Sequence, residues 1–231
     1  MIQNRRLGMI LYHGSTKIIE KPTLAAGKKH NDYGRGFYCT KEIEVAKEWA
    51  CRENSNGFVN KYRLKKSGLK VLDMQEKRYS VLNWIAVLLQ NRTFSLENAI
   101  AATAKEYIVN NFAVDTAPFD VIVGYRADDS YFSFARDFIN NALPLASLEK
   151  AMRLGKLGIQ YVLVSEKAFA QLTFTGAEAV SRETYFPKYT ARDADARAAY
   201  REEIRRAVIS KSIFVMDIIR EGMKNGDPRI Q

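Results

Sequence analysis

Strand-like segments lie near both ends of this chain, and helical patterns fill the stretch between them. Residues 9–12 and 36–40 predict two early strands and residues 158–165 a late one, because short runs rich in β-branched and aromatic residues are typical of strands. This order favours an α+β fold over an alternating βαβ sheet. Gly34 and Gly36 lack the third glycine of a dinucleotide-binding fingerprint, which argues against a Rossmann site.

Local patterns of apolar residues predict the other elements. Residues 41–52 have the spacing of an amphipathic helix with Thr40 as its N-cap. Residues 58–64 and 69–72, joined by a turn at Gly68, predict a β-hairpin. Further helices are expected at residues 80–90, 95–110, 129–140, 147–154, 191–208 and 213–223, and further strands at residues 119–125 and 172–174.

Length and composition favour one core with an appendage. A chain of 231 residues that is 47% hydrophobic can bury a sizeable core. We predict one domain at residues 1–178 and a helical C-terminal extension at residues 179–231. Cys39 and Cys51 lack partners at metal-ligand spacing, so we expect no metal and a reducing cytoplasm. The longest apolar run, at residues 81–89, is too short for a membrane span, so we expect no membrane partner.

The formal net charge of +10 is unevenly distributed. Residues 1–66 contain 14 lysines and arginines against six acidic residues, whereas residues 67–178 are nearly neutral. A basic rim in the first segment would attract the pyrophosphate of a dinucleotide or a nucleic-acid strand. The alternative is a solvated face that promotes solubility.

Two short motifs in this basic segment carry the candidate chemistry. Leu11-Tyr12-His13-Gly14-Ser15 ends the first predicted strand, and Tyr33-Gly34-Arg35-Gly36-Phe37-Tyr38-Cys39-Thr40 contains the second. Glycine lets backbone and ligand approach closely. We therefore expect His13 and Tyr38 to form the floor of a site for a flat, polar molecule.

Three segments together resemble a known family. LYHGS, then DYGRGFYCT followed by a helix with alanine and tryptophan, then QYVLVSEKA, are similar to a bacterial ADP-ribosyltransferase-like family of unknown function. That family has the fold of the diphtheria-toxin-like and poly-ADP-ribose-polymerase-like enzymes, and the resemblance covers most of residues 9–175. It implies a split antiparallel β-sheet core with helical insertions, and NAD as the substrate.

The resemblance also implies roles for single residues. His13 would bind the adenosine ribose, with an ordinary core histidine as the alternative. The Gly14 backbone would pair with the nicotinamide carboxamide, and Tyr38 would stack on the nicotinamide ring. Trp49 would be a second stacking aromatic, although a helix-core role is the alternative. Gln160 stands where transferring relatives usually have glutamate.

The glutamine limits the expected chemistry. A carboxylate there would stabilise the positive charge that develops as nicotinamide leaves, whereas an amide keeps only the hydrogen bond. We therefore take His13, Tyr38 and Gln160 as the candidate catalytic residues of single-unit transfer or slow glycohydrolysis, not of chain elongation.

Other residues are candidate ligand contacts. Ser15 and Gly36 belong to the two motifs, and Arg35 is a candidate phosphate contact. Arg126, Asp128 and Asp129 follow a predicted strand and could bind substrate, although either aspartate could be a plain helix cap. Asp32 is expected only to cap the preceding turn.

Two functions of different classes follow. The first is an NAD-dependent mono-ADP-ribosyltransferase that modifies an unknown protein or nucleic acid, compatible with a toxin or defence effector. The second is a catalytically weak or inactive NAD-binding module whose basic surface binds nucleic acid or a protein partner. The C-terminal helices are a candidate surface for homo-oligomers or for an antitoxin-like partner.

Overall fold

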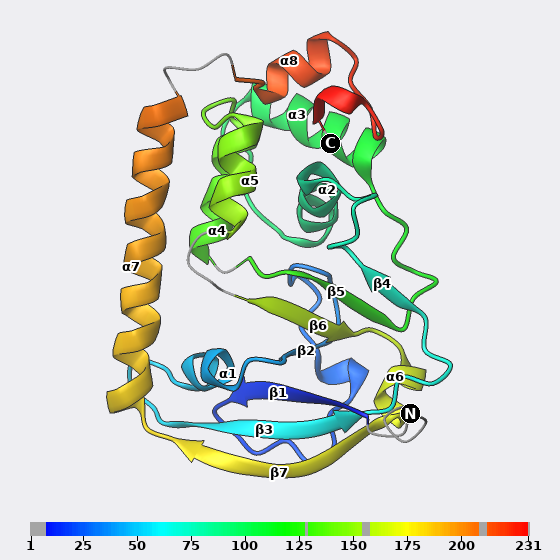
Figure 1. The fold of residues 1–231 in the computed structure, drawn as a ribbon, viewed down its shortest axis with the longest axis vertical. Coiled ribbons are helices and arrows are strands. Elements are labelled where there is room, and N and C mark those ends of the chain that lie inside the picture. Colours follow the sequence, from blue (N-terminus) through cyan, green and yellow to red (C-terminus); the bar gives the residue numbers. More distant parts are fainter. Residues whose placement is uncertain (1–7, 128, 154–157, 208–211, 231) are drawn as a thin grey trace, which may run out of the picture.

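The computed structural model describes residues 8–127, 129–153, 158–207 and 212–230. In this part of the chain, seven strands form one mixed sheet, and eight α-helices pack around it (Figure 1), so the α+β fold class is confirmed. The strands are β1 (Met9–Ser15), β2 (Phe37–Thr40), β3 (Gly57–Leu64), β4 (Val71–Asp73), β5 (Val121–Tyr125), β6 (Ile159–Leu163) and β7 (Leu172–Val180). The helices are α1 (Ile43–Ala50), α2 (Val81–Asn91), α3 (Ala99–Phe112), α4 (Asp129–Ile139), α5 (Leu145–Arg153), α6 (Glu166–Ala170), α7 (Arg182–Ala207) and α8 (Val215–Arg220).

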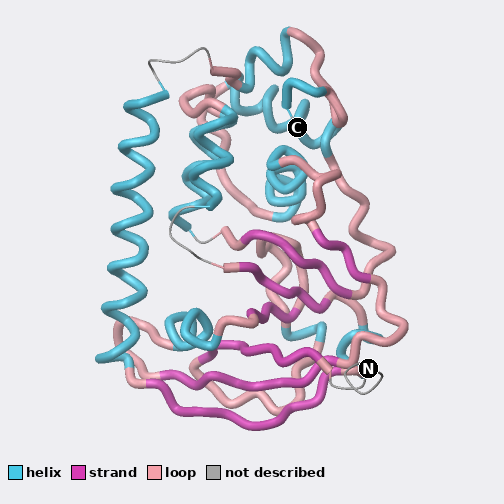
Figure 2. Tube along the Cα trace, viewed as in Figure 1, coloured by secondary structure: helices cyan, strands magenta, loops and turns pink. Residues whose placement is uncertain are grey.

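The sheet brings the beginning and the late part of the chain together at its centre. The strand order is β4-β5-β6-β2-β1-β3-β7, and β4 and β5 are parallel while the other neighbours are antiparallel. Figure 2 shows the strands in magenta and the helices in cyan. In the β2–β6 register, Thr40 lies opposite Gln160 and Tyr38 opposite Val162. The two motifs and the late strand are therefore neighbours in space.

The predicted hairpin of residues 58–64 and 69–72 is wrong. A turn does follow β3, where Leu69 N donates to Lys66 O and Gly68 has a φ of 75°. The chain then crosses to the far edge of the sheet, where β4 pairs in parallel with β5. Burial explains this course, because Leu72 is fully buried in the cluster that also contains α2.

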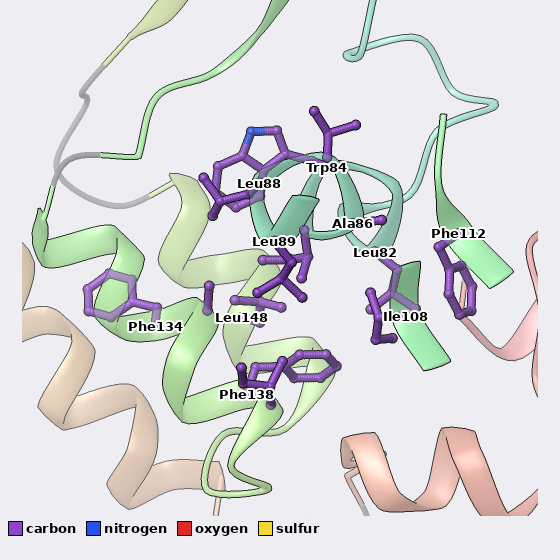
Figure 3. Packing of buried hydrophobic residues seen from close by; sticks show 14 of the residues in the cluster. Leu82, Trp84, Ala86, Leu88, Leu89, Ile108, Phe112, Phe134, Phe138 and Leu148 are labelled. Atoms are coloured by element: carbon purple, nitrogen blue, oxygen red, sulfur yellow. The ribbon is translucent and has the colours of Figure 1, made fainter. Parts of the chain in front are cut away.

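The main hydrophobic core surrounds α2. Its residues from Leu82 to Leu89 are all buried, and all of them except Asn83 are apolar, so this helix is buried around its whole circumference. Side chains of α3, α4 and α5 meet those of α2 in one cluster (Figure 3). Helix α2 was predicted at residues 80–90; in the structure it begins at Val81, and Ser80 is its N-cap, which forms a capping box with Asn83. The helical layer on this side of the sheet is thus one packed unit.

The inner strands are covered on both faces. Ile122 belongs to the cluster around α2, whereas Val121 and Val123 belong to a second cluster with Leu11 and Tyr62. Because side chains alternate along a strand, a strand buried on both faces has a continuous apolar run. This accounts for the sequence Val-Ile-Val in β5.

Helix α1 begins later than predicted. Its N-cap is Glu42, not Thr40, and the Thr40 hydroxyl instead accepts a hydrogen bond of 3.1 Å from Glu42 N. Ala46 and Ala50 are fully buried and pack with Val59 of β3. Small residues on this face let α1 lie close to the sheet.

Of the C-terminal elements, β7 and α7 are longer than predicted, whereas α8 is shorter than its predicted range of 213–223. Strand β7 continues to Val180, beyond the predicted boundary at residue 178, and pairs with β3 along its length. Helix α7 begins at Arg182 and includes Pro187 as its sixth residue, which has no N–H to donate to the Glu183 carbonyl oxygen. It lies along one side of the molecule and contacts α1, α4 and α5 (Figure 1).

Helix α8 closes the far end of the structure. It contacts α3, and its Val215 and Ile218 are fully buried in the core around α2. The division into residues 1–178 and 179–231 stays a prediction. Among the described helices, none combines the length and apolar character that crossing a bilayer requires.

Candidate functional site

A cavity of about 550 Å³ lies where β1, β2 and β6 meet the long loop between β1 and β2. Its floor includes residues of all three predicted segments, and α7 contributes one side chain to its wall. The described lining residues are His13, Gly14, Ile19, Pro22, Thr23, Ala26, Gly27, Lys28, Asn31, Asp32, Gly36, Phe37, Tyr38, Trp49, Arg52, Arg92, Arg126, Ala127, Gln160 and Tyr189.

The cavity is located where two central strands separate. In the described part of the chain, β1 and β2 have a single registered pair, Tyr12 with Thr40, whereas β1 pairs with β3 along its whole length. Beyond that pair, a side chain bridges the two strands, because His13 Nδ1 lies 2.7 Å from the carbonyl oxygen of Tyr38. Gly14 follows on β1 and lines the cavity.

This bridge defines the chemical state of His13. A carbonyl oxygen can only accept, so Nδ1 carries the proton and donates it. Burial lowers the pKa of His13 below its usual value of 6.5, and the bond to Tyr38 offsets only part of that shift. The imidazole is therefore neutral near pH 7, and its Nε2 is a hydrogen-bond acceptor.

Tyr38 is held by the turn that precedes its strand. Its hydroxyl donates to Gly34 O over 2.6 Å and accepts from Tyr33 N over 3.1 Å. Burial raises the pKa of this phenol well above its usual value, so the hydroxyl stays protonated. Because the hydroxyl is hydrogen-bonded to the preceding turn, the ring is the part of Tyr38 that can contact a flat ligand.

Gln160 is buried at the back of the cavity, with 2% of its surface exposed. Its Nε2 donates to Asp32 Oδ2 over 2.8 Å and to Tyr125 O over 3.1 Å. Gly124 lies opposite Gln160 in the β5–β6 register. A Cβ at Gly124 would lie 2.1 Å from the Tyr33 hydroxyl, so glycine is required there.

Asp32 connects four parts of the site. Besides Gln160, its Oδ2 accepts from Ala127 N over 2.8 Å, and its Oδ1 accepts from Arg92 Nε over 2.9 Å. Arg92 Nη2 also donates to Ala127 O over 2.6 Å. The buried carboxylate therefore joins the loop before β2, the end of α2, the segment after β5 and the start of β6.

The cavity is positively charged. Among the described lining residues, Lys28, Arg52, Arg92 and Arg126 carry positive charge, and Asp32 carries negative charge. Lys28 and Arg52 are exposed at the rim, while Arg92 and Arg126 are half-buried. Such a cluster attracts an anionic ligand, and arginine suits phosphate groups in particular.

Trp49 of α1 lies beneath one of these arginines. The guanidinium carbon of Arg126 is 4.1 Å from the centroid of the Trp49 ring, within the range of a cation–π contact. Trp49 is half-buried and lines the cavity. It is therefore a wall of the site as well as a residue of α1.

Two of the three glycines in the motifs, Gly14 and Gly36, have a packing role. A Cβ on Gly14 would lie 2.1 Å from the Ala46 carbonyl oxygen in α1, and a Cβ on Gly36 would lie 2.6 Å from a methyl group of Val162. These directions lead into the protein, so the missing side chains leave room for α1 and β6 more than for a ligand.

The structure brings most of the predicted site residues together. His13, Gly14, Gly36, Tyr38, Trp49, Arg126 and Gln160 all line the cavity. Ser15 and Arg35 are not among the described lining residues, and the Ser15 hydroxyl accepts from Lys17 N instead. Asp128 lies outside the described residues. Asp129 is the first residue of α4, and its side chain is not described.

The sequence reasoning missed several lining residues. Asp32 was expected to do no more than cap a turn, and its position beside the Tyr-Gly-Arg-Gly motif was the one local signal for it. Arg92 comes 60 residues later at the end of a helix, where the sequence offers no signal.

Among the described residues, no group of three or more His, Cys, Asp or Glu side chains could hold a metal. That the site holds no metal stays a prediction from the sequence.

Comparison with known proteins shows which family the chain belongs to, but it indicates no activity. Residues 9–174, which contain β1 to β6 and the cavity floor, match a protein family of unknown function, DUF3990. The chain belongs to this family. No curated protein and no solved structure matches it.

Proposed function

We propose that this protein binds NAD in the cavity and transfers its ADP-ribose unit to a macromolecular acceptor. The observation that carries the proposal is the convergence of His13, Tyr38 and Gln160, from three strands, on one positively charged cavity. A volume of about 550 Å³ lies in the range typical of small-molecule sites.

Each part of NAD has a suitable partner in the lining. The neutral His13 accepts a hydrogen bond through Nε2, which suits a ribose hydroxyl. The Tyr38 ring offers an aromatic face to the cationic nicotinamide ring. Arg92, Arg126 and the rim cations Lys28 and Arg52 suit the pyrophosphate.

The proposed reaction replaces one bond to the ribose by another. The bond from ribose C1′ to the nicotinamide nitrogen breaks, and its electron pair stays on nicotinamide, which leaves as a neutral molecule. A nucleophilic atom of the acceptor forms the new bond to C1′ and loses its proton to solvent. Gln160 contributes a hydrogen bond without the full negative charge of a carboxylate, so we expect slow turnover.

The amide at position 160 also favours a second candidate function. A module that binds NAD without cleaving it needs the same aromatic face and cations, but no charge beside the ribose. In that case the basic residues would hold nucleic acid or a partner in a salt-dependent manner.

The test is to incubate the purified protein with isotopically labelled NAD, with and without cell lysate, and to measure nicotinamide release and labelled macromolecules by mass spectrometry. Nicotinamide release with label on a macromolecule supports the transferase. NAD binding by calorimetry without any release supports the module. Absence of binding and of release contradicts both.

A further inference from the structure

The amide of Gln160 has a defined orientation. Both of its neighbours on the Nε2 side, the Asp32 carboxylate and the Tyr125 carbonyl, are acceptors, and an amide nitrogen supplies two N–H donors. Turning the amide by 180° would bring its oxygen against two other oxygens. The nitrogen must therefore face these two groups, and the oxygen Oε1 must point away from them.

Asp32 is in turn fixed from several directions. Arg92 Nε donates to Asp32 Oδ1, and Arg92 Nη2 lies 2.7 Å from the same oxygen. Ala127 N donates to the other oxygen, Oδ2. The Asp32 residue is 5% exposed, so these bonds are largely shielded from water. A charged acceptor held in this way forms stronger hydrogen bonds than a neutral one.

We propose that Asp32 is a positioning residue that holds Gln160 so that its Oε1 acts as a hydrogen-bond acceptor for the ligand. The site then selects a ligand with a donor at this point, such as a hydroxyl group. The identity of that donor as a ribose hydroxyl of NAD rests on the proposed function, whereas the orientation of the amide does not.

The same geometry predicts that glutamate is a poor replacement for Gln160. A carboxylate oxygen in the position of Nε2 would lie about 2.8 Å from Asp32 Oδ2 and about 3.1 Å from Tyr125 O, with no proton between them. Gln160→Glu should therefore weaken ligand binding, although glutamate is the residue usual in the transferring relatives that this chain resembles.

The first experiment needs no ligand. Deuterium exchange of the side-chain amide protons is followed by NMR in the full chain, with the Gln160 signals assigned by their loss in Gln160→Ala. Gln75 is the matched control, because its Nε2 also donates to an aspartate, Asp73, at an exposed site. We expect the Gln160 protons to exchange at least about tenfold more slowly than those of Gln75. Equal rates overturn the positioning role.

The second experiment measures NAD affinity by calorimetry in Asp32→Asn, Gln160→Glu and the double variant. Each single variant should lose affinity by about tenfold or more. The double variant should recover part of the affinity that Gln160→Glu loses, since it no longer places two carboxylates side by side. Asp115→Asn and Gln171→Glu, at positions outside the described cavity lining, should bind normally.

The outcomes separate the two claims. Recovery in the double variant supports positioning, because damage to the fold alone would accumulate. If the loss of binding free energy in the double variant equals the sum of the losses in the two single variants, the positioning role is contradicted. If the wild-type protein does not bind NAD while its Gln160 amide is protected, the proposed function fails and the orientation of the amide stands.

Discussion

The imidazole of His13 and the carbonyl oxygen of Tyr38 are joined by a hydrogen bond of 2.7 Å at the point where their strands stop pairing. A side chain thus takes the place of a backbone pair and keeps the two strands in a fixed relation across the opening. The bond also fixes the tautomer, so that the second ring nitrogen is left as an acceptor.

His13→Ala should reduce NAD affinity, because it removes both this bridge and the acceptor nitrogen. The expected loss is about 1–3 kcal/mol of binding free energy, measured by calorimetry. His30→Ala is the matched control, since the imidazole of His30 is exposed and is not part of the described cavity lining. Equal affinity of the two variants would count against a ligand role for His13.

Substitutions of Tyr38 separate the ring from the hydroxyl. Tyr38→Phe keeps the aromatic face and loses the bonds to Gly34 and Tyr33, so NAD affinity should change by less than about 1 kcal/mol. Tyr38→Ala removes the face and should lose about 1–3 kcal/mol. A phenylalanine variant as weak as the alanine variant would show that stacking is not the role of the ring.

The fold should lose stability in mild acid because of His13. Its pKa is lowered in the folded protein, so below about pH 6.5 the unfolded chain takes up a proton that the folded protein does not. The free energy of unfolding should fall as the pH drops from about 7 toward the lowered folded pKa, by up to about 1.4 kcal/mol per pH unit. Urea titrations at several pH values measure this, and the His13 contribution should be absent in His13→Gln. An identical pH slope in both proteins would refute the assignment.

Local patterns in the sequence predicted the helices and strands better than they predicted which strands pair and which distant residues meet. The strand β1 and the helix after Ser80 were predicted because the spacing of apolar residues is a local signal. The pairing of β4 with β5 was missed, since the burial of Leu72 against a distant helix decides it. In the same way, the motifs predicted His13 and Tyr38, but the Asp32–Arg92 pair depends on a fold that brings residues 60 positions apart together.

Gly14→Ala should destabilise the protein through α1. The added methyl group would lie 2.1 Å from the Ala46 carbonyl oxygen and 2.6 Å from Ala50 N, so the helix must shift. We expect a loss of about 1–3 kcal/mol in the free energy of unfolding, measured with urea. Ser15→Ala, at the next position on β1, should change stability by much less. A stable Gly14→Ala protein would mean that α1 can move freely on the sheet.

Tyr200 should anchor α7 by two separable contacts. Its hydroxyl donates to Asp137 Oδ2 over 2.5 Å, and its ring stacks on Phe134 at 3.8 Å between centroids. Tyr200→Phe should lose about 1–2 kcal/mol of unfolding free energy, and Tyr200→Ala about 3–5 kcal/mol. Tyr185→Phe, whose exposed hydroxyl lies 3.2 Å from Glu44, should lose less than Tyr200→Phe. If all three variants were equally stable, α7 would not depend on Tyr200.

The position of Tyr189 in the cavity wall has a consequence for synthesis. The described lining begins at His13 and ends at Tyr189 on α7, so its residues come from segments far apart in the sequence. During translation the strands of the floor emerge from the ribosome first and the last wall much later. A nascent chain therefore cannot complete the cavity wall until the first part of α7, with Tyr189, has been made.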